Sequence, residues 1–545
     1  MEECITVWPE IRHLVPELIL TVTAVLLFLH GAFRPREQKL PPWIATLALV
    51  AAAAVLAKQT VAAAVAGAVT VDPLAWFFRS TAVAAGLLLV WLRRAEGDKD
   101  YAEETACLLS AIAGAMLAAA ADDLLLVFVG LELISVPVYI LLYLGGRRVD
   151  RQEAAAKYFF LSILASAVFL YGVSFLYGVA GTLRISETAA AFSAPSQEVA
   201  VFPLGFLGVL LIFAGLAFKI TAVPFQFYAP DVYQGTTHAN AALLSVIPKA
   251  AGLAVLVRLL LVAVPGLENY LWHVAMALSV LTMTVGNVLA LRQKNLRRLL
   301  AYSAIAHAGY LLLGLTAALA SVSIGTASRW DGGAAALVYL AAYVFGTIGV
   351  FAVPAALEQG GSPVDRVTQL AGLAWSPLAS KRLLAWALAV CLFSLAGIPP
   401  LAGFWAKLAV LMSALDTGTA ALEGTPQRWL IGVTVIGAVN AAIAAGYYLR
   451  VTAVLFFGLG EGETRSAEDN VTAIYRKPGL SATLAAAACM VIVLGMGLSP
   501  ARWFRAADTA VRGLQIETPQ ASQVDDVENE TAFFCTQGEQ KPSAG

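Results

Sequence analysis

The sequence predicts an all-α polytopic membrane protein with about fourteen transmembrane helices. Hydrophobic residues make up 59% of the 545 residues and charged residues only 13%, about half the charged share of soluble domains. Apolar stretches recur from about residue 15 to about residue 498. Many of them have close to the 20 residues that a helix needs to cross a bilayer. Composition and hydropathy therefore both place the chain in a membrane.

The predicted helices follow from apolar runs that charged or turn residues interrupt. Their approximate spans are 15–32, 42–64, 74–92, 104–120, 124–144, 153–179, 202–228, 238–262, 270–290, 298–318, 331–354, 382–413, 428–456 and 480–498. Basic connections such as "RPREQK" (34–39), "RRAEGDK" (93–99) and "RQKNLRR" (292–298) fall on one side of the membrane. The positive-inside rule makes that side cytoplasmic, so we expect both termini on the opposite side of a bacterial inner membrane.

The helices group into repeats. We expect five segments: a three-helix N-terminal segment (1–103), a five-helix repeat (104–262), a second five-helix repeat (270–457), a loop with the last helix (458–500) and a polar, disordered tail (501–545). An odd number of spans per repeat turns the second repeat upside down relative to the first. The sequence therefore predicts inverted repeats.

Proline interrupts the fourth helix of each repeat. The first interruption is Pro224, in "LAFKITAVPFQFYAPDVYQG", and the second is Pro399 with Pro400, in "FSLAGIPPLAGFWAKLAV". Proline breaks the backbone hydrogen bonding of a helix, and membranes tolerate this where protein or water satisfies the freed groups. Broken helices at matching places of two halves indicate an ion site in transporters. The alternative is a chance pair of proline kinks, which are common in membrane helices.

Six ionisable side chains lie within or next to apolar helical runs, where charges are rare and usually functional. They are Glu132, Lys157, Lys219, Lys249, His307 and Lys407. Structural alternatives exist for three of them. Lys157 could form a surface pair with Glu153 four residues earlier, Lys249 could extend its stem to the interface, and His307 could be a packing residue.

These residue types allow proton transfer, because burial lowers the pKa of a lysine and a nearby carboxylate raises it. A Glu–Lys pair followed by further lysines and a histidine predicts a proton relay. Other polar residues receive lesser roles. Arg79, Arg258 and Arg450 are expected to anchor helix ends at the interface, and His238 with Asp231 forms a candidate aqueous mouth after the first broken helix.

Several classes of function are disfavoured. A net charge of −1 without a basic patch gives no support to nucleic-acid binding. The five cysteines are isolated, so we expect no metal or iron–sulfur site in this chain. The glycines of "GLGEGE" (458–463) follow a long apolar helix rather than a strand, and they are interpreted as a loop without a nucleotide.

Four segments carry a resemblance to a known family: "KYFFLSILASAVFLYGVSFLYG", "FKITAVPFQFYAPDVYQG", "GNVLALRQKNLRRLLAYSAIAHAGYLLLG" and "FSLAGIPPLAGFWAKL". They resemble the antiporter-like subunits of proton-pumping NADH:quinone oxidoreductase (respiratory complex I), and are most similar to subunit N. The resemblance implies that Glu132 pairs with Lys219 and that Lys249 connects to Lys407. It gives Lys157 and His307 the remaining relay positions.

The resemblance also implies partners. Other membrane-arm subunits and lipid surround such a chain, and NADH, FMN, iron–sulfur clusters and quinone are expected on partner subunits, with no cofactor in this one. The sequence departs from the family at Gln226 and Tyr228, where the family commonly has histidine and tryptophan. "TTHAN" also replaces a proline-rich turn. Alternatives are a cation/proton antiporter subunit, a membrane subunit of a related hydrogenase or ferredoxin-linked complex, and a structural scaffold with paired charges.

Overall fold

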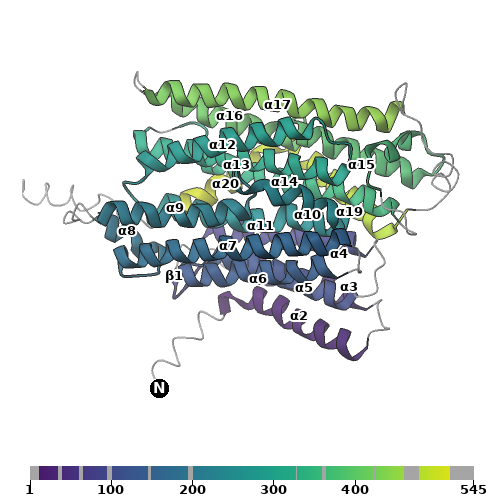
Figure 1. Cartoon of the computed structure of the whole chain (residues 1–545), viewed down its shortest axis with the longest axis horizontal. Helices are drawn as coiled ribbons and strands as arrows, with labels where there is room; N and C mark the ends of the chain where they lie inside the picture. The colour runs from purple at the N-terminus through teal and green to yellow at the C-terminus, as the bar shows by residue number, and fades with distance from the viewer. Residues whose placement is uncertain are drawn as a thin grey trace, which may run out of the picture.

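A computed structural model describes residues 12–34, 40–59, 65–94, 101–144, 149–193, 201–326, 328–358, 364–421, 425–458 and 478–515. Long helices run roughly side by side along the longest axis of the molecule (Figure 1). Thirteen described helices are long and apolar enough to cross a membrane, and α9 adds a shorter apolar helix. The prediction of an all-α, multi-pass membrane protein with about fourteen spans is confirmed.

The first half of the chain contains the N-terminal helices and the first group of five spans. The N-terminal elements are α2 (Val15–Phe33), α3 (Pro41–Lys58), the short hairpin β1 (Val65–Ala66) and β2 (Val69–Thr70), and α4 (Pro73–Arg93). The next spans are α5 (Tyr101–Ala120), α6 (Leu124–Tyr143), α7 (Val149–Ala180), α9 (Val201–Lys219) and α11 (His238–Arg258). Shorter elements between and after them are α8 (Ile185–Ser193), η1 (Phe225–Tyr228), α10 (Ala229–Gly235) and the π-helical η2 (Leu259–Ala263).

The second half repeats a group of five spans and then adds two helices. The group comprises α12 (Glu268–Ala290), α13 (Leu296–Ile324), α14 (Gly332–Leu357), the pair α15 (Ala379–Ala396) and α16 (Ala402–Ala420), and α17 (Thr425–Phe457). The 3-10 turns η3 (Val367–Leu370) and η4 (Leu373–Trp375) precede α15, and α19 (Leu480–Leu498) and α20 (Pro500–Gln515) close the described chain. The inverted relation of the two groups stays a prediction.

Side-chain caps fix where several spans begin. Asp72 accepts a hydrogen bond from the first turn of α4, Asp123 from α6, and Thr237 from α11. Asn295 and Asp331 do the same for α13 and α14. Each cap satisfies a backbone N–H that has no partner within the helix. Polar residues between apolar runs therefore mark the helix starts.

Four described helices form the buried centre of the bundle: α5, α11, α13 and α14. By contrast, at most 39% of the membrane-length stretch is buried in α2, α3, α7, α12 and α17, as expected of membrane-facing helices. Glycine allows close approach at the α12–α13 contact. A Cβ on Gly286 would lie 2.5 Å from the Ala306 nitrogen, and one on Gly309 would lie 2.5 Å from Met283 Cγ. Small residues commonly let membrane helices pack backbone to backbone.

The broken helices end where the prolines predict. Helix α9 ends at Lys219, and η1 and α10 continue after Pro224. The expected span 382–413 is two helices, because α15 ends at Ala396 and α16 begins at Ala402, on either side of Pro399 and Pro400.

Two expectations at the periphery are wrong. The predicted tail 501–545 starts with α20, which packs against α4 and α14; the residues after 515 and the loop 459–477 lie outside the described residues. Arg79 and Arg258 are buried ion pairs rather than interfacial anchors. Arg79 lies 2.7 Å from Glu17, and Arg258 lies 2.8 Å from Asp72. Carboxylates from distant helices supply these partners, which sequence spacing alone does not reveal.

Candidate functional site

Lys219 lies at the end of α9 among hydroxyl groups. Its ammonium group donates hydrogen bonds to Ser135 Oγ on α6 at 2.6 Å and to Ser162 Oγ on α7 at 3.0 Å. Both serines and the lysine are buried. Because α9 ends at this residue, the chain turns away and leaves the side chain facing α6 and α7.

Glu132 occupies the next position along the same two helices. It lies three residues before Ser135 on α6, and Ser166 Oγ, four residues after Ser162 on α7, donates to its Oε1 at 2.5 Å. Within the described residues, Glu132 and Lys219 form no direct ion pair. Ser135 and Ser162 thus bond the ammonium group, and Ser166, on the same helix as Ser162, bonds the carboxylate.

Lys249 lies in the middle of α11 and is 0% exposed. Its ammonium group donates to the Ala304 carbonyl oxygen of α13 and to the Tyr343 hydroxyl of α14, the latter at 3.4 Å. No carboxylate contacts it within the described chain. An ammonium ion in apolar surroundings is costly unless hydrogen bonds compensate it. Snorkelling, the structural alternative, does not occur.

His307 lies between two tyrosines. Its Nδ1 is 2.7 Å from the Tyr339 hydroxyl, and its Nε2 is 2.9 Å from the Tyr448 hydroxyl. Tyr448 also bonds Ser303. One ring nitrogen of a neutral histidine donates and the other accepts, and a hydroxyl can do either. The arrangement can therefore pass a proton in at one nitrogen and out at the other.

Lys407 folds back onto the end of α15. Its ammonium group donates to the carbonyl oxygens of Leu395 at 2.8 Å and Ala396 at 2.9 Å. These carbonyls belong to the last turn of α15, where helical partners are missing. Gly397 makes the approach possible. Its backbone is left-handed (φ 90°), and a Cβ there would lie 2.9 Å from Lys407 Cδ.

Two small cavities connect these groups. One is bordered by His307, Tyr343 and Lys407, and the other by Ser303, Ala304 and Tyr343. Each has room for about one water molecule. Tyr343 borders both cavities and also contacts Lys249. The described side chains thus form a series from Lys249 through Tyr343 and His307 to Lys407.

Lys157 stands apart from this series. It lies near the start of α7 with 39% of its side chain exposed, and its ammonium group is 2.7 Å from both Glu153 and Asp231. The surface pair with Glu153 is therefore present, with a second carboxylate added from α10. Arg298 also binds Asp231, at 2.7 Å. Burial raises the pKa of Asp231, but the hydrogen bonds from Lys157 and Arg298 outweigh it and hold that pKa below its usual value.

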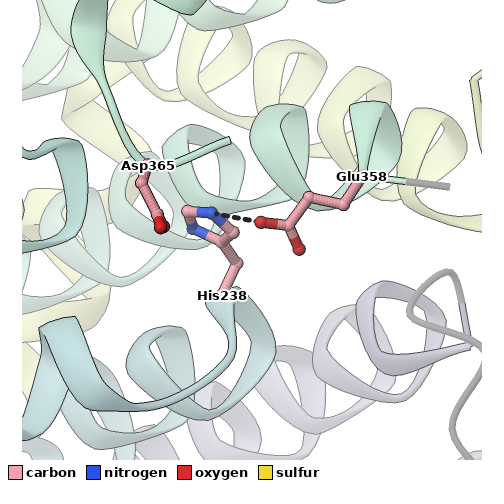
Figure 2. A group of neighbouring side chains, drawn as sticks. All are labelled: His238, Glu358 and Asp365. Atoms are coloured by element: carbon pink, nitrogen blue, oxygen red, sulfur yellow. Dashed lines mark ion pairs between the residues drawn. The ribbon is translucent and has the colours of Figure 1, made fainter. Parts of the chain in front are cut away.

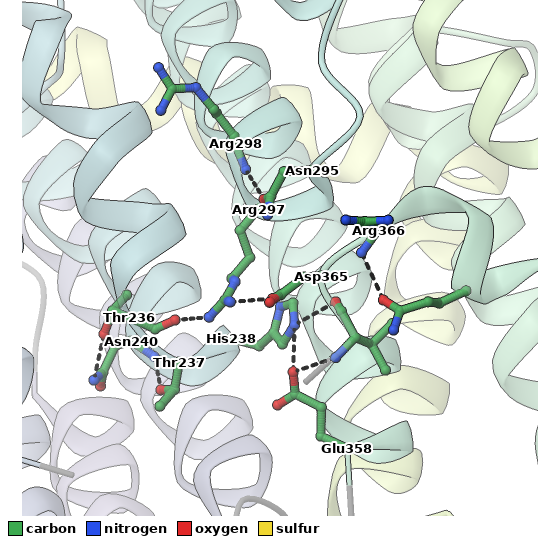
Figure 3. A network of polar contacts seen from close by, with 12 residues as sticks. Thr236, Thr237, His238, Asn240, Asn295, Arg297, Arg298, Glu358, Asp365 and Arg366 are labelled. Carbon is green, nitrogen blue, oxygen red and sulfur yellow. Dashed lines mark hydrogen bonds and ion pairs between the residues drawn. The ribbon is translucent and has the colours of Figure 1, made fainter. Parts of the chain in front are cut away.

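His238 begins α11 and lies in a polar network between α11, α13 and α14 (Figure 3). Its Nε2 is 2.9 Å from Glu358 Oε1 and 3.2 Å from the Val364 carbonyl oxygen. A carbonyl oxygen only accepts, so Nε2 carries the proton. Burial raises the pKa of Glu358, but the charge and hydrogen bond of His238 and the charge of Arg297 hold it below its usual value. His238 is buried, not part of an open aqueous mouth.

His238, Glu358 and Asp365 form a group whose ligand atoms lie within 4.8 Å of one another (Figure 2). Arg297 also binds Asp365 and the Thr236 carbonyl oxygen. In the structure His238 pairs with Glu358, and Arg297 pairs with Asp365.

Comparison with known proteins identifies the family of the chain. A model of the family "NADH:quinone oxidoreductase/Mrp antiporter, TM" matches residues 121–425, more than half of the chain and a range that contains all six predicted site residues. NADH-quinone oxidoreductase subunit N of Trichlorobacter lovleyi is 37% identical over 83% of this chain and 88% of its own length. NADH-quinone oxidoreductase subunit N 1 of Solibacter usitatus is 36% identical over 88% of this chain and 93% of its own length. The chain belongs to the NADH-quinone oxidoreductase subunit N family.

Solved structures agree with membership of the subunit N family. A chain of respiratory complex I from Thermus thermophilus, solved with bound aureothin, matches with TM-score 0.71 and 31% identity, covering 91% of this chain and all of the other. A chain of the Mrp complex from Dietzia matches with TM-score 0.75 and 23% identity, over 92% of this chain and 97% of the other. The second likeness shows a common fold.

The sequence analysis did not predict the hydroxyl groups that contact the site residues. These are Ser135, Ser162, Ser166, Ser303, Tyr339, Tyr343 and Tyr448. One signal was available: Ser135 follows Glu132 by three residues, and Ser162 precedes Ser166 by four, so each pair shares a helix face. Serine and tyrosine are too common in membrane helices for the remaining positions to stand out.

Proposed function

We propose that this chain is a proton-translocating membrane-arm subunit of an NADH-quinone oxidoreductase. Membership of the subunit N family and the likeness to a chain of complex I support the assignment. The observation that carries the proton-transfer role is the set of three buried lysines, Lys219, Lys249 and Lys407, each held by neutral oxygen atoms. A purely structural lysine would be expected to have a carboxylate partner, as the buried arginines do.

The proposed transfer uses groups that can both give and take a proton. Lys249 releases a proton toward the Tyr343 hydroxyl and the water-sized cavity beside it. His307 then accepts at one ring nitrogen and releases at the other, and Lys407 is reached across the second cavity. Each hydroxyl that gives a proton takes another, so no charge remains on a tyrosine. Lys219 with Glu132 forms the corresponding site of the first repeat, linked by serines.

Energy for transport must then come from outside this chain. We place NADH, FMN, iron–sulfur clusters and quinone on partner subunits, because the sequence contains no motif for them. A movement that brings Glu132 toward Lys219 or away from it would change how strongly the lysine holds its proton. We assign the basic connections to the cytoplasmic side and both termini to the opposite side.

A cation/proton antiporter subunit is the second candidate. The fold shared with a chain of the Mrp complex favours it. Formation of a pH gradient that depends on sodium, in membranes without quinone reductase activity, would support this candidate over the first.

The test replaces Lys249 with methionine, which keeps the length of the side chain and removes the charge. The complex carrying Lys249→Met is reconstituted in vesicles, and NADH-driven quinone reduction and proton uptake are measured together. We expect proton uptake per NADH to fall about tenfold or more. Lys58→Met, at an exposed lysine of α3, is the control and leaves the ratio unchanged. Full pumping by an assembled Lys249→Met complex would contradict the proposal.

A further inference from the structure

A cavity of about 390 Å³ lies on the outside of the bundle, between α3, α4 and α19. Trp43 and Thr46 of α3, Trp91 and Arg94 at the end of α4, and Ser481 and Leu484 of α19 line it. Helix α4 packs against both α3 and α19. The volume of the cavity falls in the range of small-molecule sites, and none of the six predicted proton-transfer residues borders it.

The cavity lies at one end of the bundle. Helix α3 begins at Pro41, α4 ends at Arg93 and α19 begins at Leu480, so three helix ends of the same side meet there.

Arg94 supplies an anchored cation at the rim. Its guanidinium carbon lies 4.7 Å from the centroid of the Trp43 ring, a stacking arrangement that holds the group flat and leaves its N–H donors available. Arg94 forms no ion pair with any described residue. A planar guanidinium matches the oxygens of a phosphate, and Ser481 adds a hydroxyl in the first turn of α19.

Apolar groups continue from the rim toward the membrane. Trp43 is 58% exposed, and Leu47 on α3 and Leu484 on α19 also face outward. Tryptophan is typical of the headgroup level of a bilayer. The cavity therefore combines a cation at headgroup level with apolar walls below it, which is the polarity profile of a phospholipid.

We propose that this cavity binds the phosphodiester headgroup of an anionic phospholipid, with Arg94 on the phosphate and the acyl chains along α3 and α19. The charge of Arg94, which forms no ion pair with a described residue, favours a lipid with net negative charge over a zwitterionic one. Phosphatidylglycerol and cardiolipin share the required chemistry. The proposal depends on membrane insertion and not on proton transport.

The test uses the intact complex in vesicles of phosphatidylcholine with a photoactivatable phosphatidylglycerol, a photoactivatable cardiolipin or a photoactivatable phosphatidylcholine. Labelled peptides are mapped by mass spectrometry. We expect both anionic probes to label α3 or α19, and Arg94→Gln to lower that labelling about tenfold. Arg382→Gln, at an exposed arginine of α15 on the same side, is the control and leaves it unchanged.

Three results would overturn the proposal. One is equal labelling in Arg94→Gln and Arg382→Gln, and another is equal labelling by phosphatidylcholine, which would indicate ordinary boundary lipid. The third is no labelling in the complex, because another subunit then covers the cavity. Trp43→Leu, which removes the ring under Arg94, should also lower labelling. This variant replaces Arg94→Gln in the test if the Arg94→Gln complex fails to assemble. Proton uptake per NADH, measured on the same samples, tests the proposed function separately.

Discussion

The two broken helices place a lysine in different surroundings. At the first break, Lys219 is the last residue of α9, and its ammonium group bonds the hydroxyls of Ser135 and Ser162. At the second break, Lys407 lies beyond the prolines, on α16, and bonds the Leu395 and Ala396 carbonyls that end α15. Hydroxyls both donate and accept, whereas carbonyl oxygens only accept. The negative end of a helix dipole also stabilises a nearby cation.

The two breaks also differ in the residue that takes up the left-handed backbone conformation. Thr221 at the first break has φ 62°, a left-handed conformation that is a true outlier for a β-branched residue. The second break uses Gly397 at φ 90°, where glycine has no such cost. The carbonyls of the first break are bonded by the chain itself, as the Phe218 carbonyl is by Tyr228 and by the Thr221 nitrogen. The comparison indicates a second break built around its lysine and a first break that holds its lysine through neighbouring helices.

The largest expected effect is that of Gly397→Ala. A Cβ would strain the left-handed backbone by about 1–2 kcal/mol and press on Lys407. We expect a lower melting temperature of the complex and a loss of most proton uptake per NADH. Gly372→Ala is the matched control, since Gly372 has φ 69° but nothing within 4 Å of a new Cβ. If both variants gave the same proton uptake per NADH, the contact between Lys407 and Gly397 would not contribute to pumping.

The next effect concerns the serines of the first break. In Ser135→Ala with Ser162→Ala, the buried Lys219 ammonium group loses both of its described hydrogen bonds, which costs about 1–3 kcal/mol per unsatisfied group. We expect proton uptake per NADH to fall about tenfold while the complex assembles. Ser110→Ala is the control, because within the described chain this buried hydroxyl bonds only the Ala106 carbonyl of its own helix. Unchanged pumping in the double variant would show that Lys219 does not act through these hydroxyls.

A smaller effect is expected for Thr221→Gly. Glycine removes a backbone strain of about 1–3 kcal/mol but adds flexibility that costs about 0.5–1 kcal/mol. Among the described residues, Thr221 Oγ1 bonds only the neighbouring Ile220 carbonyl. The melting temperature should therefore stay the same or rise slightly, with pumping retained. A clear drop in melting temperature would mean that the threonine stabilises the first break.

The smallest effect is expected at Asp231, which joins α10 of the first break to Lys157 and Arg298. Its pKa is held below the usual value, so its contribution to stability is present above the ordinary Asp pKa and is lost as pH falls through the lowered value. The side chain of Asp231 is 38% exposed, and exposed ion pairs contribute about 0–1 kcal/mol. Melting curves of Asp231→Asn and the unaltered complex should differ slightly at pH 7 and converge only in strong acid. A difference that disappears near pH 6 would contradict this.

The spans and the breaks could be predicted because apolar length and proline act locally along the chain. Glu132, Lys219, Lys249, His307 and Lys407 could be selected because a charge or imidazole inside an apolar run has few explanations. Their partners could not be, since Ser162 and Tyr448 gain meaning only from helices far away in the sequence. Arg79 and Arg258 show the same limit, because Glu17 and Asp72 pair them from other helices. Helix α20 was missed because its mixed polarity is like that of the tail that follows.

The central claim is that buried lysines carry protons and do not merely supply positive charge. Lys407→Arg tests it most directly, because arginine keeps the charge but does not release its proton, and the cavity beside Lys407 gives some room for the larger group. The measurement is proton uptake per NADH by the assembled complex in vesicles. The account predicts that quinone reduction continues while proton uptake per NADH falls about tenfold or more. An unchanged ratio would contradict it.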